Sequence, residues 1–139
     1  MKMTRNHALA TVALFVLSAG LAAADHGDQS QTRLKTKLSG AAIQAKTPEG
    51  NADFRSDTAK KRTQLTVEVE HVNLPAGTML DVTIQHGAAS QVVGQIKLSA
   101  LGEGELDLNS QDGAAVPAVQ KGDMVTVSNA GTPILAGVF

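Results

Sequence analysis

Cysteine, tryptophan and tyrosine are absent from this sequence of 139 residues, and phenylalanine occurs only three times. Without cysteine the chain can form neither a disulfide nor a thiolate metal site, and it offers no cysteine for a lipid anchor. The shortage of aromatics argues against nucleic-acid recognition and against carbohydrate recognition by stacking, because bases and sugar rings both stack on exposed aromatic rings. The fold must therefore rest on its apolar core, and we expect no nucleic-acid partner.

Long hydrophobic runs are also absent, with one exception near the N-terminus. A short basic stub precedes an apolar run from Ala8 to Leu17, and Ala22-Ala23-Ala24 stands directly before Asp25. This order is typical of a secretory signal peptide with its cleavage site, and the run is short for a membrane span. We predict a signal peptide over residues 1–24, export to the periplasm or out of the cell, and no transmembrane segment in the mature chain.

The mature chain has the length of one domain. Removing 24 residues from 139 leaves 115, which is enough for a single core and too few for two. Residues 25–32 are polar and show no apolar periodicity, so we predict a flexible tail there. The domain should then span residues 33–139.

The clearest structural pattern lies between Gln64 and Gln85. Two runs alternate apolar and polar residues, and Asn73-Leu74-Pro75-Ala76-Gly77 separates them. Alternation of period two is typical of half-buried strands, because successive side chains leave a strand on opposite faces. We predict that the two runs pair as a β-hairpin, with His71 continuing the inward face of the first run.

Similar short runs recur along the rest of the mature chain, separated by polar or glycine-containing turns. Gly94 lies inside one of them and suggests a bulge or a close backbone approach, with Val92 on the inward face of that run. The pattern predicts an all-β fold, an antiparallel β-sandwich of immunoglobulin-like or related type with about seven to eight strands. The expected strands are residues 33–39, 51–56, 64–70, 80–85, 91–98, 103–108, 124–129 and 133–139.

Charge is divided unevenly along the mature chain. Residues 25–62 carry eight basic and five acidic groups, whereas residues 63–139 carry two basic and eight acidic groups. An edge rich in cations attracts anionic partners through a field that salt screens. The candidate residues for anionic-partner binding are Arg33, Lys35, Lys37, Lys60, Lys61 and Arg62.

Three histidines of the mature chain are the candidate metal ligands: His26, His71 and His86. His26 would be the second residue after cleavage, where the terminal amine and the imidazole together can chelate a metal ion. No spacing typical of a metal site joins the three. A partly covered imidazole is the more ordinary role for His71 and a solvated start of the chain is the more ordinary role for His26, whereas His86 stands in a loop where it could bind a ligand. Metal binding is therefore the alternative function, and we expect no bound cofactor.

Catalytic motifs are lacking as well. The sequence has no Gly-x-Ser-x-Gly and no cysteine nucleophile, and no serine stands near a paired histidine and aspartate. We predict no catalytic residues. A small hydrolase remains only a third hypothesis.

Several phrases resemble those of small secreted bacterial proteins of unassigned function and, more distantly, of the CHRD domain. They are Leu38-Ser39-Gly40, Thr47-Pro48-x-Gly50-x-Ala52-x-Phe54-Arg55, Val67 to Gly77, and Ile134 to Phe139. CHRD sequences tend to carry His-Ile-His before a glycine-rich turn, and Thr83 to Gly87 keeps only the second histidine, His86. The resemblance implies a β-sandwich without catalysis. Our leading hypothesis is an exported, non-catalytic module for binding or cell-envelope interaction, whose macromolecular partner the sequence does not identify.

Overall fold

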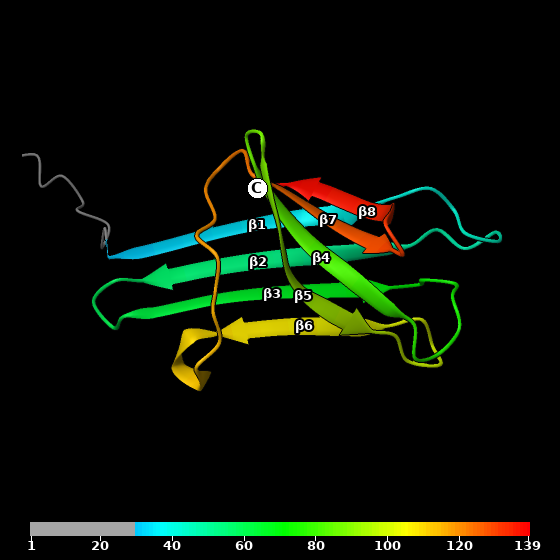
Figure 1. Cartoon of the computed structure of the whole chain (residues 1–139), viewed down its shortest axis with the longest axis horizontal. Coiled ribbons are helices and arrows are strands. Elements are labelled where there is room, and N and C mark those ends of the chain that lie inside the picture. Colours follow the sequence, from blue (N-terminus) through cyan, green and yellow to red (C-terminus); the bar gives the residue numbers. More distant parts are fainter. Residues whose placement is uncertain (1–29) are drawn as a thin grey trace, which may run out of the picture.

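The computed structural model describes residues 30–139, which form eight strands around one core (Figure 1). The predicted signal peptide and most of the predicted tail lie outside the described residues. Within residues 30–139 the only helix is a short 3-10 turn, η1 (Ser110–Asp112), and no helix there is long and apolar enough to cross a membrane. The strands are β1 (Gln31–Ser39), β2 (Glu49–Asp57), β3 (Arg62–Glu70), β4 (Met79–His86), β5 (Ala89–Lys97), β6 (Gly104–Asn109), β7 (Met124–Asn129) and β8 (Thr132–Val138).

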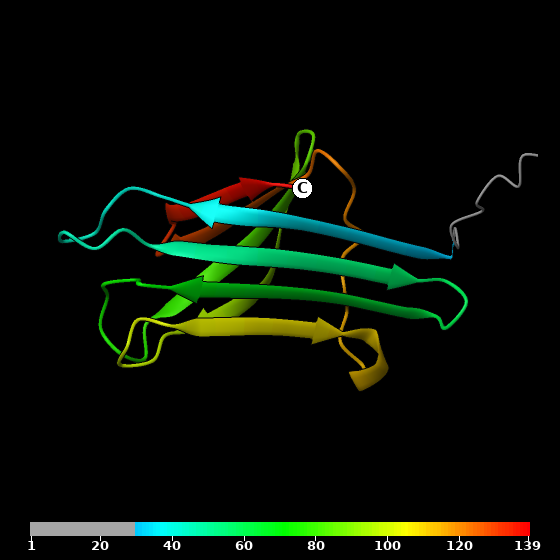
Figure 2. The same ribbon diagram turned by 180° about the vertical axis from the view of Figure 1, so that it is seen from behind.

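The strands are antiparallel and follow the order β5-β4-β7-β8-β1-β2-β3-β6 in one nearly closed sheet. Between β8 and β1 the register holds a single pair, Ser39 with Ala136, so the sheet divides there into two layers. Strands β1, β2, β3 and β6 form one layer, and β4, β5, β7 and β8 cross it obliquely (Figures 1 and 2). The predicted all-β antiparallel sandwich is confirmed.

The two ends of the sheet, β5 and β6, lie against each other without forming a ladder. A Cβ added at Gly94 would lie 2.8 Å from both methyl carbons of Leu106, and one at Gly104 would lie 2.4 Å from Cγ2 of Ile96. Only glycine allows an approach this close, so these two positions let β5 and β6 pack closely against each other. The prediction that Gly94 marks a bulge or a close approach is correct on both counts, because the β4–β5 register also shifts opposite it.

The core lies between the layers and takes alternate residues from each strand. In the first layer the register aligns inward rows across the strands, for example Leu34, Phe54, Leu65 and Leu108. The second layer contributes buried residues from its own strands: Leu80, Val82, Ile84, Ile96, Val125, Val127 and Leu135. Because the buried positions of the strands hold apolar residues or glycine, the charged residues that alternate with them lie on the outer faces.

The predicted pairing of the two central runs is wrong. Strand β3 pairs with β2 and β6, whereas β4 pairs with β5 and β7, so the segment between them crosses from one layer to the other. Val72 is buried and Leu74 packs against the core, which directs this segment over the end of the sandwich. Alternation shows that both strands are half-buried, but strands that share a core can face each other instead of pairing. The connection from β3 to β4 therefore links the two facing layers of the sandwich.

Val92 is exposed, contrary to the prediction, with 60% of its surface accessible. Gly94 pairs with Val82 of β4, and Val92 pairs with the next residue, Thr83. Val93 therefore has no partner in β4 and is an extra residue in β5. An extra residue inverts the alternation on one side of the bulge. Strand β1 begins at Gln31, two residues before the expected start, and it lies inside the sheet, whose edges are β5 and β6.

Two valines of the β4–β5 hairpin test this arrangement with the same chemical change. Val82 is fully buried, so Val82→Ala should lower the free energy of unfolding by about 2 to 3 kcal/mol through lost burial and a residual cavity. Val92→Ala should change it by less than about 0.5 kcal/mol. Urea unfolding followed by circular dichroism measures both, and similar losses at the two positions would contradict the bulge.

Candidate functional site

The outer face of the layer β1-β2-β3-β6 carries most of the charged side chains of the first half of the chain. Because the strands are in register, outward residues form rows across the layer, for example Lys35, Asp53, Thr66 and Asp107. The outward residues of β1 include Arg33, Lys35 and Lys37, and those of β6 include Glu105 and Asp107. The face is therefore basic along β1 and acidic along β6.

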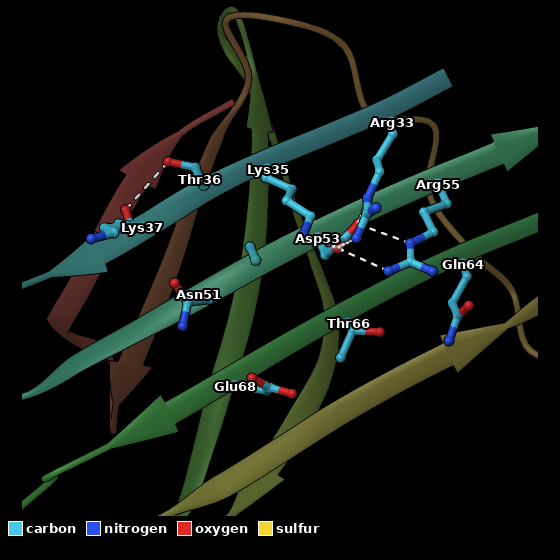
Figure 3. Close-up of a pocket in the computed structure, with 11 residues that line it drawn as sticks. Arg33, Lys35, Thr36, Lys37, Asn51, Asp53, Arg55, Gln64, Thr66 and Glu68 are labelled. Carbon is cyan, nitrogen blue, oxygen red and sulfur yellow. Dashed lines mark hydrogen bonds and ion pairs between the residues drawn. The ribbon is translucent and has the colours of Figure 1, made fainter. Parts of the chain in front are cut away.

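A hollow of about 620 Å³ lies on this face across β1, β2 and β3 (Figure 3). Cationic side chains from β1 and β2 form one side of it, and polar or acidic side chains from β3 form the other. The residues that line it are Arg33, Lys35, Thr36, Lys37, Asn51, Ala52, Asp53, Arg55, Gln64, Thr66 and Glu68. A hollow with this lining can accept an anionic group on its basic side.

Asp53 organises the basic side of the hollow. Its Oδ1 and Oδ2 accept hydrogen bonds from Nε and Nη2 of Arg33 at 3.3 and 2.7 Å, and from the same atoms of Arg55 at 3.2 and 3.2 Å. The ammonium of Lys35 lies 3.3 Å from Oδ2. Three cations thus converge on one carboxylate, as Figure 3 shows. This ionic cluster holds the two guanidinium groups in fixed positions.

The ionic cluster lowers the pKa of Asp53. Partial burial alone would raise this pKa, but the hydrogen bonds from Arg33, Arg55 and Lys35 outweigh it and hold the pKa well below its ordinary value of 3.8. The hydrogen bond to Asp53 in turn raises the pKa of Arg33. Asp53 and Arg33 are therefore both ionised at neutral pH.

The cluster keeps an excess of positive charge. Three cations and one carboxylate give a net charge of +2, and each arginine uses only two of its donors on Asp53. Nearby, the ammonium of Lys37 makes no ion pair with any residue of the part that the structure describes. Because Asp53 holds Arg33 and Arg55 in place, their remaining N–H donors can bind an anion without rearrangement of the side chains.

A second hollow, of about 520 Å³, continues the first towards the β2–β3 turn and shares Arg33, Arg55 and Gln64 with it. Lys60 and Arg62 line this second hollow, and Lys60 lies 3.8 Å from Oδ2 of Asp57. We call the six cations that line the two hollows the basic face: Arg33, Lys35, Lys37, Arg55, Lys60 and Arg62.

Five of the six residues predicted to bind an anionic partner lie on the basic face. Lys61 is the exception, since it lies in the β2–β3 turn with a φ of 51° and lines neither hollow. Arg55 belongs to the site and was not predicted. It could have been found from its place in the predicted strand 51–56, two residues after Asp53 and therefore on the same face.

His71 does not continue the inward face of β3, which corrects the prediction made from its parity. Strand β3 ends at Glu70, and His71 has a φ of 58°, which breaks the alternation and leaves the side chain 58% exposed. Its Nδ1 lies 3.0 Å from Oε1 of Glu49 on β2.

His86 lies at the end of β4 and contacts Asp123, which precedes β7. The two groups are 2.5 Å apart, from Nδ1 to Oδ1, and Asp123 is only 2% exposed. Burial would raise the pKa of Asp123, but hydrogen bonds from the backbone N–H of Gln120 and from His86 lower it below its ordinary value. The buried carboxylate fixes the imidazole, while most of the ring remains exposed to solvent.

The three predicted metal ligands are not seen together. His26 lies outside the described residues, and no group of three or more metal-ligating side chains among residues 30–139 contains both His71 and His86. The pairing of His86 with Asp123 could not be read from the sequence, because 37 residues separate them. Among residues 30–139, no hydroxyl group is hydrogen-bonded to this pair.

No protein-family model matches the chain, and no curated protein is significantly similar to it in sequence. The likeness to the CHRD domain thus rests on the quoted phrases alone.

Asp53→Asn tests the ionic cluster. The variant should lose about 1 kcal/mol of stability at neutral pH, a value typical of largely exposed ion pairs. The folded-state pKa of Asp53 is depressed, so its contribution is complete above about pH 4 and is lost as the pH falls below that value. The wild type should therefore lose more stability than the variant between about pH 4 and pH 2.

Unfolding in urea at several pH values, followed by circular dichroism, measures this difference. Asp112→Asn is the matched control, because Asp112 is exposed in the turn η1 and forms no ion pair with a described residue. Parallel pH profiles for the wild type and Asp53→Asn would contradict the stabilising role of the cluster.

The two histidines allow a second matched comparison. His86→Asn removes the imidazole from a buried carboxylate and should cost about 1 to 3 kcal/mol. His71→Asn should cost less than about 0.5 kcal/mol, because His71 and Glu49 are both exposed and asparagine tolerates a positive φ. Thermal unfolding measures both losses, and an equal loss in the two variants would show that Asp123 does not depend on His86.

Proposed function

We propose that this protein is an exported, non-catalytic binding module that captures an acidic polysaccharide on its basic face. The observation that carries the proposal is the pair of adjoining hollows, which six cations line and one central carboxylate organises. The ligand binds through its carboxylate or sulfate groups, which pair with the guanidinium and ammonium groups.

The spacing of the cations supports an extended ligand with repeated charges. Arg33, Lys35 and Lys37 alternate along β1, so their Cα atoms are about 7 Å apart in sequence order. Arg55 is the register partner of Arg33 on the neighbouring strand, which widens the row of charges at that point. A single small anion would contact only part of this surface, whereas a linear polyanion can occupy both hollows at once.

The chemistry of the face disfavours other anionic partners. Phe54 is 4% exposed and Phe139 packs against the core, so neither provides a ring for stacking on an unpaired base. The residues that line the first hollow are polar or charged except Ala52, so this surface has no apolar group to insert into a lipid layer. A polar polymer fits such a surface better than a nucleic acid or a membrane.

The absence of enzymatic activity is part of the proposal. The cations are held by Asp53, whose pKa is depressed, so this carboxylate stays ionised and is a poor general acid or base near neutral pH. The pair of His86 and Asp123 has no hydroxyl bonded to it among residues 30–139, and a hydrolase of the serine type needs one.

Arg33→Gln combined with Arg55→Gln tests the proposed function. Heparin serves as the sulfated polysaccharide, and isothermal titration calorimetry gives its Kd. The double variant should bind at least about tenfold more weakly, since each lost charge-assisted hydrogen bond is worth about 1.5 kcal/mol or more. The affinity of the wild type should fall as salt is raised.

Lys97→Gln combined with Lys121→Gln is the matched control, because it removes the same charge from exposed positions away from the basic face. Its affinity should stay within about twofold of the wild type. An equal loss in the two double variants would show that net charge, and not the geometry of the face, determines binding, and a salt-independent Kd would overturn the proposal.

A further inference from the structure

A group of three metal-ligating side chains lies beyond the basic face, at the far end of β2 and β3. Glu49 and Glu70 are register partners on these strands, and His71 follows Glu70 directly. One ligand atom from each residue lies within 4.8 Å of the other two. All three side chains are exposed, so a metal ion in solution can reach them.

The backbone at His71 explains how neighbouring residues can converge. Successive side chains of a strand point to opposite faces, so Glu70 and His71 would normally diverge. The φ of 58° at His71 ends the alternation and brings its imidazole to the same side as Glu70 and Glu49. Val69 and Val72 are both buried, and the N–H of Val72 bonds the carbonyl of Gly102 at 3.0 Å, so the backbone is anchored on both sides of the pair.

The charges of this group are not balanced within the described part of the protein. Glu49 and Glu70 oppose each other across the strands, an arrangement that destabilises a sheet. Neither carboxylate forms an ion pair with a lysine or arginine among residues 30–139, and in this part of the chain Glu49 contacts only the imidazole of His71. A bound divalent cation would replace this repulsion with two favourable contacts.

We propose that Glu49, Glu70 and His71 form a binding site for a zinc-type divalent cation. One imidazole nitrogen and two carboxylate oxygens suit Zn²⁺, which takes such ligands at about 2.0 to 2.2 Å and leaves a fourth position to water. Calcium prefers six to eight oxygens, so it fits this set poorly. The site is independent of the anion-binding function and does not involve His26 or His86.

The chain contains an internal control for the role of the imidazole. Glu68 on β3 and Glu105 on β6 are also register partners with no lysine or arginine paired to them among the described residues, but no histidine joins them. If two opposed glutamates sufficed, this second pair would bind the ion as well. The proposal requires that it does not.

Titration calorimetry of the purified protein with ZnCl2 in a non-chelating buffer tests the site. The wild type should bind one equivalent, and His71→Asn and Glu49→Gln should each raise the Kd at least about tenfold. Asparagine preserves the positive φ at position 71, so loss of binding in His71→Asn reports the missing ligand and not a changed backbone. Glu68→Gln and His26→Asn are the controls and should keep the wild-type Kd.

Thermal unfolding gives a second, independent reading. Saturating zinc should raise the Tm of the wild type by several degrees and leave the Tm of His71→Asn unchanged, because only a ligand of the native state stabilises it. Binding that is lost in His26→Asn but retained in His71→Asn would move the site to the N-terminus and overturn the proposal. So would the absence of zinc binding by the wild type.

Discussion

Burial of alternate side chains between two facing layers is the constraint on which this structure depends. The chain has no disulfide to support it, so each strand must contribute one apolar face to the shared core. Since the side chains of a strand alternate, fixing the inward set also fixes the outward set. The rows of cations and carboxylates on the outer face of β1-β2-β3-β6 are therefore a consequence of core formation, and the register that stacks Leu34 on Phe54 also places Arg33 beside Arg55.

This coupling explains which features the sequence could predict. Alternation identified the strands and the sandwich, because it depends only on each strand having a buried side. It could not show that β3 and β4 lie in different layers, since strands that share a core look alike whether they pair or face each other. It failed at Val92 and at His71, where an extra residue and a positive φ end the alternation. Both are local backbone events without a clear signal in the order of apolar and polar residues.

The candidate sites show the same limit. The cations of β1 could be predicted as a group because they alternate on one strand, and Lys60 and Arg62 because they stand in one short basic run. The role of Asp53 depends on neighbours 20 residues earlier and two residues later, and the first of these is brought close only by the β1–β2 register. The other two groups likewise join residues that are far apart in sequence, since His86 and Asp123 are 37 positions apart and Glu49 and His71 are 22 positions apart. A site whose residues come from different segments of the chain can be recognised only when the fold is known.

The two proposed sites share strand β2 but should act independently in ordinary buffers. Glu49 and Asp53 are four residues apart on this strand, which is about 14 Å in an extended chain. That distance exceeds the Debye length of about 8 Å at physiological ionic strength, so a cation at Glu49 barely changes the potential at the ionic cluster. At low salt the screening length grows beyond the separation. Zinc and a polyanion should then favour each other's binding, because the bound cation adds positive charge to the face that attracts the polymer.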